Sequence, residues 1–291
     1  MFGEFLQYLF SGLTTGATYA LVGLGFAIIY NASHVINFAQ GEFLMIGGMG
    51  TVMIMAAGVP MPLAILAAVA LAVVAGVLLE KFAIERAGSA EIVPLIIITI
   101  GASLVLRGLA QYFWGKAYHA VPAFSGDEPI RVMGATLLPQ SLWVLGIGAV
   151  LVVALAFFFN RTLTGKAMLA VSHNKDAARM VGINPRLVLM LAFALAAALG
   201  AIAGVVSAPI TLTSYDVGIM LGLKGFVAAV LGGLGSAVGA VAGGLLLGLM
   251  EAMAAGYISS DYKDAVPFVI ILLVLFFMPS GLFGKRGTER V

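Results

Sequence analysis

The chain has 291 residues, of which 62% are hydrophobic and 10% charged, and its mean hydropathy is +1.12. Soluble domains average about 25% charged residues, so this composition excludes an ordinary soluble protein and predicts an integral membrane protein. The net charge of +2 says little, because the placement of Lys and Arg orients a membrane protein. Cysteine is absent and the three histidines are scattered, so we expect this chain to bind no metal and no cofactor.

Apolar runs of about twenty residues recur along the chain, each long enough to cross a hydrocarbon core of about 30 Å. The predicted helices span residues 5–30, 63–79, 92–113, 142–159, 187–206 and 266–283, with a further apolar region at 219–255. GGLGS at 232–236 interrupts that region and predicts two short helices, or a re-entrant helix and a full span. We therefore expect an all-α polytopic fold of about eight or nine transmembrane helices, in one domain covering residues 1–291.

A polar sequence, NASHVINFAQGEF at 31–43, follows the first apolar run without a proper loop. Ionisable groups at the bilayer centre cost about 2.5–3.5 kcal/mol on insertion scales and usually face a cavity or a partner. The pattern predicts a broken helix inside the membrane. Asn31, Asn37, Gln40 and Glu42 could line a substrate pathway or satisfy the backbone of the break, and an interfacial loop is the alternative.

Isolated charges occur in other apolar runs. Glu251 is a further candidate for the pathway. The region after Ser207 repeats the pattern of the first 55 residues, in which a glycine-rich apolar helix and a break precede a helix with one glutamate. Lys224 could pair with Glu251 or with Glu42, although snorkelling to the membrane interface is the favoured interpretation. Arg107, near a helix end, is expected to anchor its helix in the same way.

The distribution of charge predicts the orientation of the chain. Residues 80–91, 161–186 and 284–291 together hold ten of the fifteen Lys and Arg, with five acids. The N-terminus, residues 114–141, the link with Asp216 and the turn 257–264 hold three bases and six acids. The positive-inside rule places the first set in the cytoplasm.

The stretch 161–186 is polar and basic between two apolar runs. A helix from Lys166 to Val181, stopped by Gly182, would present a small apolar face made of Ala167, Ala170, Val171, Ala177, Ala178 and Val181. Such a face is suited to docking on another protein, whereas an ordinary surface loop has no need of it. No phosphate-binding loop or catalytic arrangement is present, so we expect no enzyme.

Three segments resemble a known family: GLTTGATYALVGLGFAIIYNASHVINFAQGEFLMIGG at 12–48, GKAMLAVSHNKDAARMVGIN at 165–184 and KGFVAAVLGGLGSAVGAVAGGLLLGLME at 224–251. They are similar to the permease subunit of branched-chain amino-acid ABC importers, the H-type subunit of the leucine, isoleucine and valine system. The resemblance covers nearly the whole chain. It implies a multi-pass protein of the bacterial plasma (inner) membrane.

The resemblance also implies a coupling helix at about 166–182 that contacts a separate ATPase. The candidate coupling residues are Lys166, Ala170, Asp176, Ala177, Ala178, Arg179 and Gly182. The family's Glu-Ala-Ala reads Asp-Ala-Ala here, a conservative departure. The implied partners are a second homologous permease, two ATP-binding subunits that carry ATP and Mg, an extracytoplasmic substrate-binding protein and membrane lipid, with no nucleic acid.

The sequence thus predicts a permease that imports leucine, isoleucine and valine, driven by ATP hydrolysis on its partners. Import of urea, short amides or other amino acids by the same architecture is the first alternative. A proton-coupled secondary transporter working through Glu42 or Glu251 would also account for buried acids, but not for a docking helix in the cytoplasm. A channel or a structural scaffold is the weakest alternative.

Overall fold

The computed structural model describes residues 2–88 and 91–284. Its long helices are α1 (Phe2–Ser33), α2 (Gln40–Ala56), α3 (Met61–Leu79), α5 (Ile92–Trp114), α6 (Pro139–Arg161), α9 (Pro185–Thr211), α10 (Val217–Gly232), α11 (Ala237–Tyr257) and α12 (Ala265–Phe277). Shorter elements are the π-helical turn η1 (Glu80–Ile84), α4 (Glu85–Ala87), α7 (Leu163–His173), α8 (Lys175–Met180), the 3₁₀ turn η2 (Ser260–Tyr262) and strands β1 (Ile130–Val132) and β2 (Ala135–Leu137).

The expectation of an all-helical, polytopic fold is confirmed. Six helices within the described residues are long and apolar enough to cross a membrane, namely α1, Met61–Ala87 as one continuous unit, α5, α6, α9 and α11. Helices α10 and α12 are shorter apolar helices, and α2 has 17 residues. The charged segment after residue 79 continues the α3 helix instead of forming a loop, and the helix ends at Ala87, before Gly88, whose φ is +62°.

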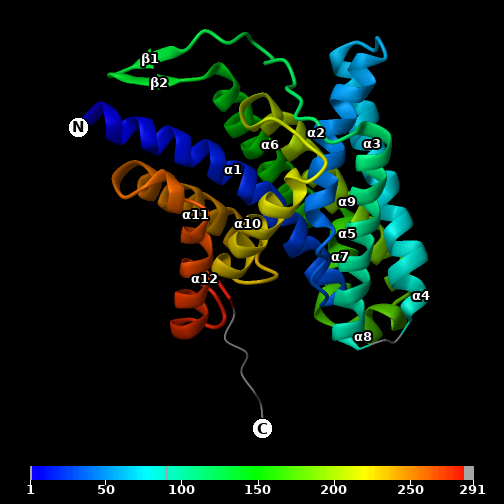
Figure 1. Ribbon diagram of the computed structural model, residues 1–291. Coiled ribbons are helices and arrows are strands. Elements are labelled where there is room, and N and C mark those ends of the chain that lie inside the picture. Colours follow the sequence, from blue (N-terminus) through cyan, green and yellow to red (C-terminus); the bar gives the residue numbers. More distant parts are fainter. Residues whose placement is uncertain (1, 89–90, 285–291) are drawn as a thin grey trace.

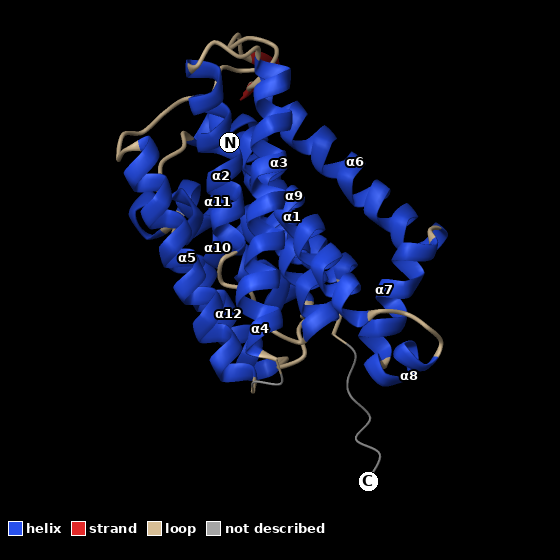
Figure 2. Cartoon of the chain, turned by 90° about the vertical axis from the view of Figure 1, so that its right-hand side faces the viewer, coloured by secondary structure: helices blue, strands red, loops and turns tan. Residues whose placement is uncertain are grey.

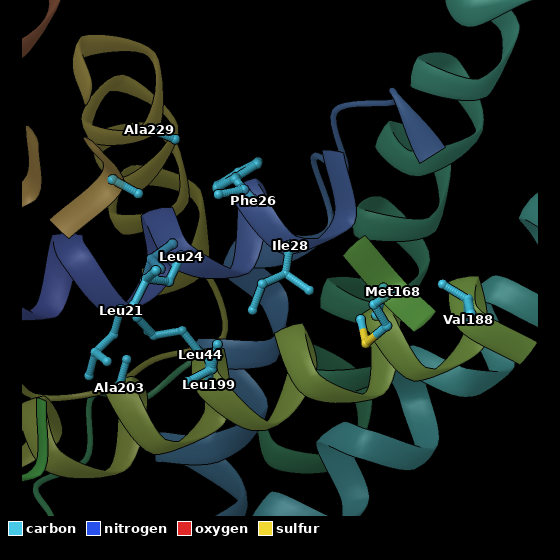
Figure 3. Packing of buried hydrophobic residues seen from close by; sticks show 14 of the residues in the cluster. Leu21, Leu24, Phe26, Ile28, Leu44, Met168, Val188, Leu199, Ala203 and Ala229 are labelled. Atoms are coloured by element: carbon cyan, nitrogen blue, oxygen red, sulfur yellow. The ribbon is translucent and has the colours of Figure 1, made fainter. Parts of the chain in front are cut away.

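Helix α1 lies at the centre of the bundle and α5 at its edge. The apolar window of α1 is 89% buried inside the chain, whereas that of α5 is 6% buried, so α5 lies on the outer surface of the bundle. Figure 3 shows Leu21 and Leu24 of α1 beside Leu44 of α2 and Leu199 of α9. Small residues allow this close approach: a Cβ on Gly16 would lie 2.8 Å from the Cα of Leu245 on α11.

The predicted breaks at 31–43 and GGLGS are both present. Residues 34–39 separate α1 from α2, with His34 at a φ of 57°, and residues 233–236 separate α10 from α11. A third break, at 212–216, lets α10 start beside the start of α2. At that junction a Cβ on Gly218 would meet the backbone of Gly41 and lie 3.0 Å from Glu42 Oε2. Two discontinuous helices therefore meet with their N-termini together inside the bundle.

The two ends of the bundle carry the two predicted sets of charge. At one end, Arg186 Nη1 of α9 lies 3.4 Å from Glu85 Oε1 of α4, near α8 (Figure 1). At the other end, Gln7 Oε1 of α1 accepts a 2.7 Å hydrogen bond from the backbone N–H of Thr136 in β2. The positive-inside rule makes the first end cytoplasmic. The basic tail 285–291 lies outside the described residues.

The loop 114–141 contains a structure that the sequence analysis did not predict. Strands β1 and β2 form an antiparallel hairpin in which Val132 pairs with Ala135. The two residues between them, Met133 and Gly134, have φ values of 49° and 87°, as a two-residue hairpin turn of the primed type requires. The hairpin lies over the N-terminal end of α1 (Figure 1).

Candidate functional site

The cytoplasmic segment between α6 and α9 forms two helices, where the sequence analysis expected one at 166–182. Asn174 interrupts the helix: its φ is −157°, and its side-chain oxygen accepts hydrogen bonds from the backbone N–H groups of Asp176 and Ala177 at 3.0 and 2.9 Å. Asparagine caps a helix in this way because its side chain replaces the missing backbone acceptor. Thr162 caps α7 similarly, and Gly182, with a φ of +86°, follows α8.

Most of the predicted coupling residues lie on the surface. Lys166, Asp176, Ala177, Arg179 and Gly182 are exposed, Ala170 is half-buried and Ala178 is buried. The predicted small apolar face was partly wrong, because Val171 and Ala178 pack into the core of this chain. The most exposed large apolar side chains here are Leu163, Met180 and Val181, at 87%, 87% and 77%. Large apolar side chains exposed beyond the membrane-spanning helices are typical of a protein-docking surface.

A groove of about 510 Å³ lies between α1, α6, α7 and α11. Helix α6 lies along one side of the bundle and leads into α7 and α8 (Figure 2). Three polar residues line the groove from the last turns of their helices: Asn31 of α1, Asn160 of α6 and Ser172 of α7. The remaining lining is largely aliphatic, with Leu24 and Ile28 among its residues.

Helix α7 is a wall of this groove. Met168, Leu169 and Ser172 of α7 line it, together with Asn31 of α1. The Asn31 amide donates a 2.7 Å hydrogen bond to the carbonyl of Gly235, which also lines the groove. The predicted coupling segment and one predicted pathway residue therefore border the same space.

Three other predicted pathway residues, Asn37, Gln40 and Glu42, are buried at the break before α2. Gln40 Nε2 donates to the carbonyl of Ala196 on α9 at 2.9 Å, and Asn37 Oδ1 accepts from the N–H of Ala39 at 3.1 Å. The bond to Ala39 satisfies a backbone N–H at the break, as a non-helical segment in a membrane requires, and the bond from Gln40 ties the break to α9. None of the three lines the groove described above.

Glu42 lies between α2, α5 and α10. Its Oε1 accepts a 2.8 Å hydrogen bond from the Ser103 hydroxyl of α5. Arg107, one turn further along α5, is half-buried, and its role as an interfacial anchor stays a prediction. Within the described residues, Glu42 Oε2 has no hydrogen-bond partner.

Glu251 belongs to a separate charged cluster. Its Oε1 accepts a 2.8 Å hydrogen bond from Lys224 Nζ, and its Oε2 accepts one of 2.8 Å from the Tyr19 hydroxyl. Lys224 also donates to Asp264 Oδ1 at 2.6 Å. This hydrogen bond lowers the pKa of Asp264 from its ordinary value. The snorkelling interpretation of Lys224 was wrong, because its side chain is 5% exposed and ion-paired inside the bundle.

The five predicted pathway residues thus lie in three places: Asn31 in the groove, Asn37, Gln40 and Glu42 at the break, and Glu251 in the charged cluster. Sequence reasoning missed Tyr19, Ser103 and Asp264, which complete the last two places. A hydroxyl on an apolar helix carries no local signal of its partner. For Asp264 the sequence offered one indication of an ion pair, because this acid lies in the turn 257–264 directly before an apolar helix.

A family model for the permease component of branched-chain amino acid transport systems matches residues 8–275. The chain belongs to this family. The permease is 34% identical to the high-affinity branched-chain amino acid transport system permease protein LivH of Escherichia coli K12, over 99% of this chain and 98% of the relative. It is 32% identical to BraD of Pseudomonas aeruginosa, a permease protein with the same description, with the same coverage.

A more distant relative of the permease is the fructose import permease protein FruF of Bifidobacterium longum, 26% identical over 76% of this chain and 61% of the relative. Among solved structures, PsaBC from Streptococcus pneumoniae in complex with Fab has a TM-score of 0.52 and 12% identity. That alignment covers 96% of this chain and 97% of the other, and it shows a shared fold alone. The chain is therefore a multi-pass membrane protein and a non-catalytic component of a transport system.

Proposed function

We propose that this permease imports branched-chain amino acids and is driven by ATP hydrolysis on two partner ATPase subunits. ATP and Mg bind those partners, an extracytoplasmic binding protein delivers the solute, and a second permease completes the membrane part. The substrate class is supported by the two relatives of about one-third identity, both described as high-affinity branched-chain amino acid permeases.

The observation that carries the mechanism is the position of α7 in the wall of the groove. Its residues Leu169 and Ser172 line a mainly aliphatic space whose polar groups lie at the cytoplasmic end. An aliphatic side chain gains about 25 cal/mol per Å² of apolar surface removed from water, so such a lining favours leucine, isoleucine and valine over urea. The groove is our candidate for part of the solute path.

Movement of the ATPase would reach the groove through α8 and α7. The exposed side chains of Leu163, Met180 and Val181 offer the docking surface, and the caps at Thr162 and Asn174 fix the two helices. A displacement of α7 changes the width of the groove, because α1 and α11 form its other side. A conformational change in the ATPase would thereby control whether the solute path is open to the cytoplasm.

Substrate competition tests the proposed solute. The permease is reconstituted in vesicles with its partner subunits, and uptake of labelled leucine is measured with unlabelled competitors. Isoleucine and valine should inhibit uptake, whereas urea, acetamide and acidic amino acids should not. Equal inhibition by urea or acetamide at the same concentration would contradict the proposal that the solute is a branched-chain amino acid.

Cysteine labelling tests the groove, because the chain has no native cysteine. Ala156→Cys places a thiol in the groove, and Ala154→Cys places one on the same helix outside the groove lining. Modification with a bulky maleimide should abolish uptake in the first variant and leave the second active. If the maleimide inhibited both variants equally, or inhibited neither, the groove would not be part of the solute path.

A further inference from the structure

The cluster around Lys224 joins four parts of the chain that no local pattern connects. Lys224 lies on α10, Glu251 on α11, Tyr19 on α1 and Asp264 immediately before α12. The ammonium lies 2.8 Å from the carboxylate of Glu251 and 2.6 Å from that of Asp264, and 5.6 Å from the centre of the Tyr19 ring. One cation is therefore shared by two carboxylates.

The two carboxylates differ in their access to water. The side chain of Glu251 is 10% exposed and that of Asp264 is 47% exposed. Separating Lys224 from Glu251 would leave a buried charge without its partner, which is strongly destabilising. Separating Lys224 from Asp264 returns Asp264 to water while Lys224 keeps Glu251, and Glu251 keeps the Tyr19 hydroxyl. The Asp264 contact is therefore the one that can open.

Helix α12 is attached differently at its two ends. Beyond its C-terminal end, the backbone N–H groups of Leu282 and Phe283 donate 2.9 Å hydrogen bonds to the carbonyls of Leu231 and Gly232 at the end of α10. Its first turns rest on the apolar cluster that includes Ile270, and Val266 packs against this cluster. At the extracytoplasmic end, this helix is joined to the bundle by the hydrogen bond from Lys224 to Asp264.

We propose that Lys224 is a positioning residue for α12, and that its contact with Asp264 is a releasable clasp. When the clasp is closed, the first turn of α12 is held against the apolar cluster on which Val266 packs. When it opens, the extracytoplasmic end of α12 moves away while the other end stays attached to α10. The clasp concerns how α12 is held and does not depend on which solute is carried.

Thiol accessibility in the full complex tests the clasp. Val266→Cys provides a half-buried reporter in the first turn of α12, and an impermeant maleimide is added from the extracytoplasmic side. Asp264→Asn removes one charge and should raise the labelling rate at least fivefold. Asp261→Asn is the matched control, because Asp261 lies in the same turn and its side chain forms no ion pair with any of the described residues. It should leave the rate within twofold.

A second variant separates release from misfolding. Asp264→Glu keeps the carboxylate on a longer side chain and should restore slow labelling of the Val266→Cys reporter. Each variant is checked for a monodisperse complex by size-exclusion chromatography. Equal labelling rates for Asp264→Asn and Asp261→Asn, or fast labelling of Asp264→Glu in a monodisperse complex, would overturn the clasp.

Discussion

The side-chain amide of Asn31 donates a 2.7 Å hydrogen bond to the carbonyl oxygen of Gly235, and thereby joins the last turn of α1 to the turn between α10 and α11. Asn31→Ala should lower the free energy of unfolding by about 0.5–1.5 kcal/mol, the usual net value of a neutral hydrogen bond. Thermal unfolding in detergent measures this. Asn160→Ala is the control, because Asn160 lines the same groove but donates to Ala156 of its own helix. A greater loss of stability in Asn160→Ala than in Asn31→Ala would contradict the role of Asn31 in joining α1 to this turn.

Gly182 ends the segment that we expect to contact the ATPase. It is exposed, has a φ of +86°, and a Cβ there would meet no atom within 4 Å. Gly182→Arg should leave the protein inserted, at a cost of about 1–2 kcal/mol for a left-handed backbone, but abolish ATPase binding and uptake. Co-purification of the ATPase measures binding. Asparagine tolerates a left-handed backbone, so the Gly182→Asn variant should still bind the ATPase. Normal uptake by Gly182→Arg would contradict a coupling role for this segment.

The cap at Asn174 separates α7 from α8, so its removal should disorder α8 alone. Asn174→Ala should cost about 1 kcal/mol of local stability, and faster amide hydrogen exchange at residues 175–180 measures it. Asn174→Asp keeps a capping oxygen and should behave like the natural protein. Unchanged exchange in Asn174→Ala would mean that the cap does not determine the break.

Glu42 decides between a structural and a proton-coupled role for the break before α2. Glu42→Gln keeps an oxygen for the Ser103 hydroxyl and removes the titratable group. If the break is structural, uptake and its pH dependence should stay close to those of the natural protein. Ser103→Ala should instead lower the free energy of unfolding by about 0.5–1.5 kcal/mol, the usual net value of one hydrogen bond. Loss of the pH dependence in Glu42→Gln would support proton coupling.

The clasp at Asp264 should be insensitive to moderate acid. The hydrogen bond and charge of Lys224, with a smaller contribution from Lys263, lower its pKa, while partial burial opposes them. A lowered pKa means that the contact persists above the ordinary aspartate pKa of about 3.9 and is lost as the pH falls through the lower folded value. The labelling rate of Val266→Cys, divided at each pH by the rate of a free thiol because maleimide reacts with the thiolate, should therefore be constant from about pH 8 to pH 5. A rise near pH 6 would contradict this.

Hydropathy alone predicted most of the membrane-spanning helices, because an apolar segment of about twenty residues is long enough to cross a bilayer as a helix. The breaks at 34–39 and 233–236 were also predictable, since a cluster of amides or glycines within an apolar run disfavours a continuous helix. The hairpin at β1 and β2 was missed, although Met133-Gly134 lies where a hairpin turn needs positive φ. The local break at Asn174 was missed because a capping residue can also occupy a helix.

The charged cluster could not be predicted by any local pattern. Tyr19 and Glu251 are 232 residues apart in sequence, and Lys224 and Asp264 are 40 apart. Sequence spacing shows which residues share a helix face, but not which helices lie side by side. The groove was hidden for the same reason, since α1, α6, α7 and α11 each contribute one side of it.

Uptake of leucine by sealed vesicles tests the central claim most directly. The permease is reconstituted alone with an imposed proton gradient, and in parallel with its partner permease, ATPases and binding protein, with and without ATP. We expect uptake only in the complete assembly with ATP, and loss of that uptake when the assembly carries Gly182→Arg. Uptake by the permease alone on the proton gradient would contradict the account.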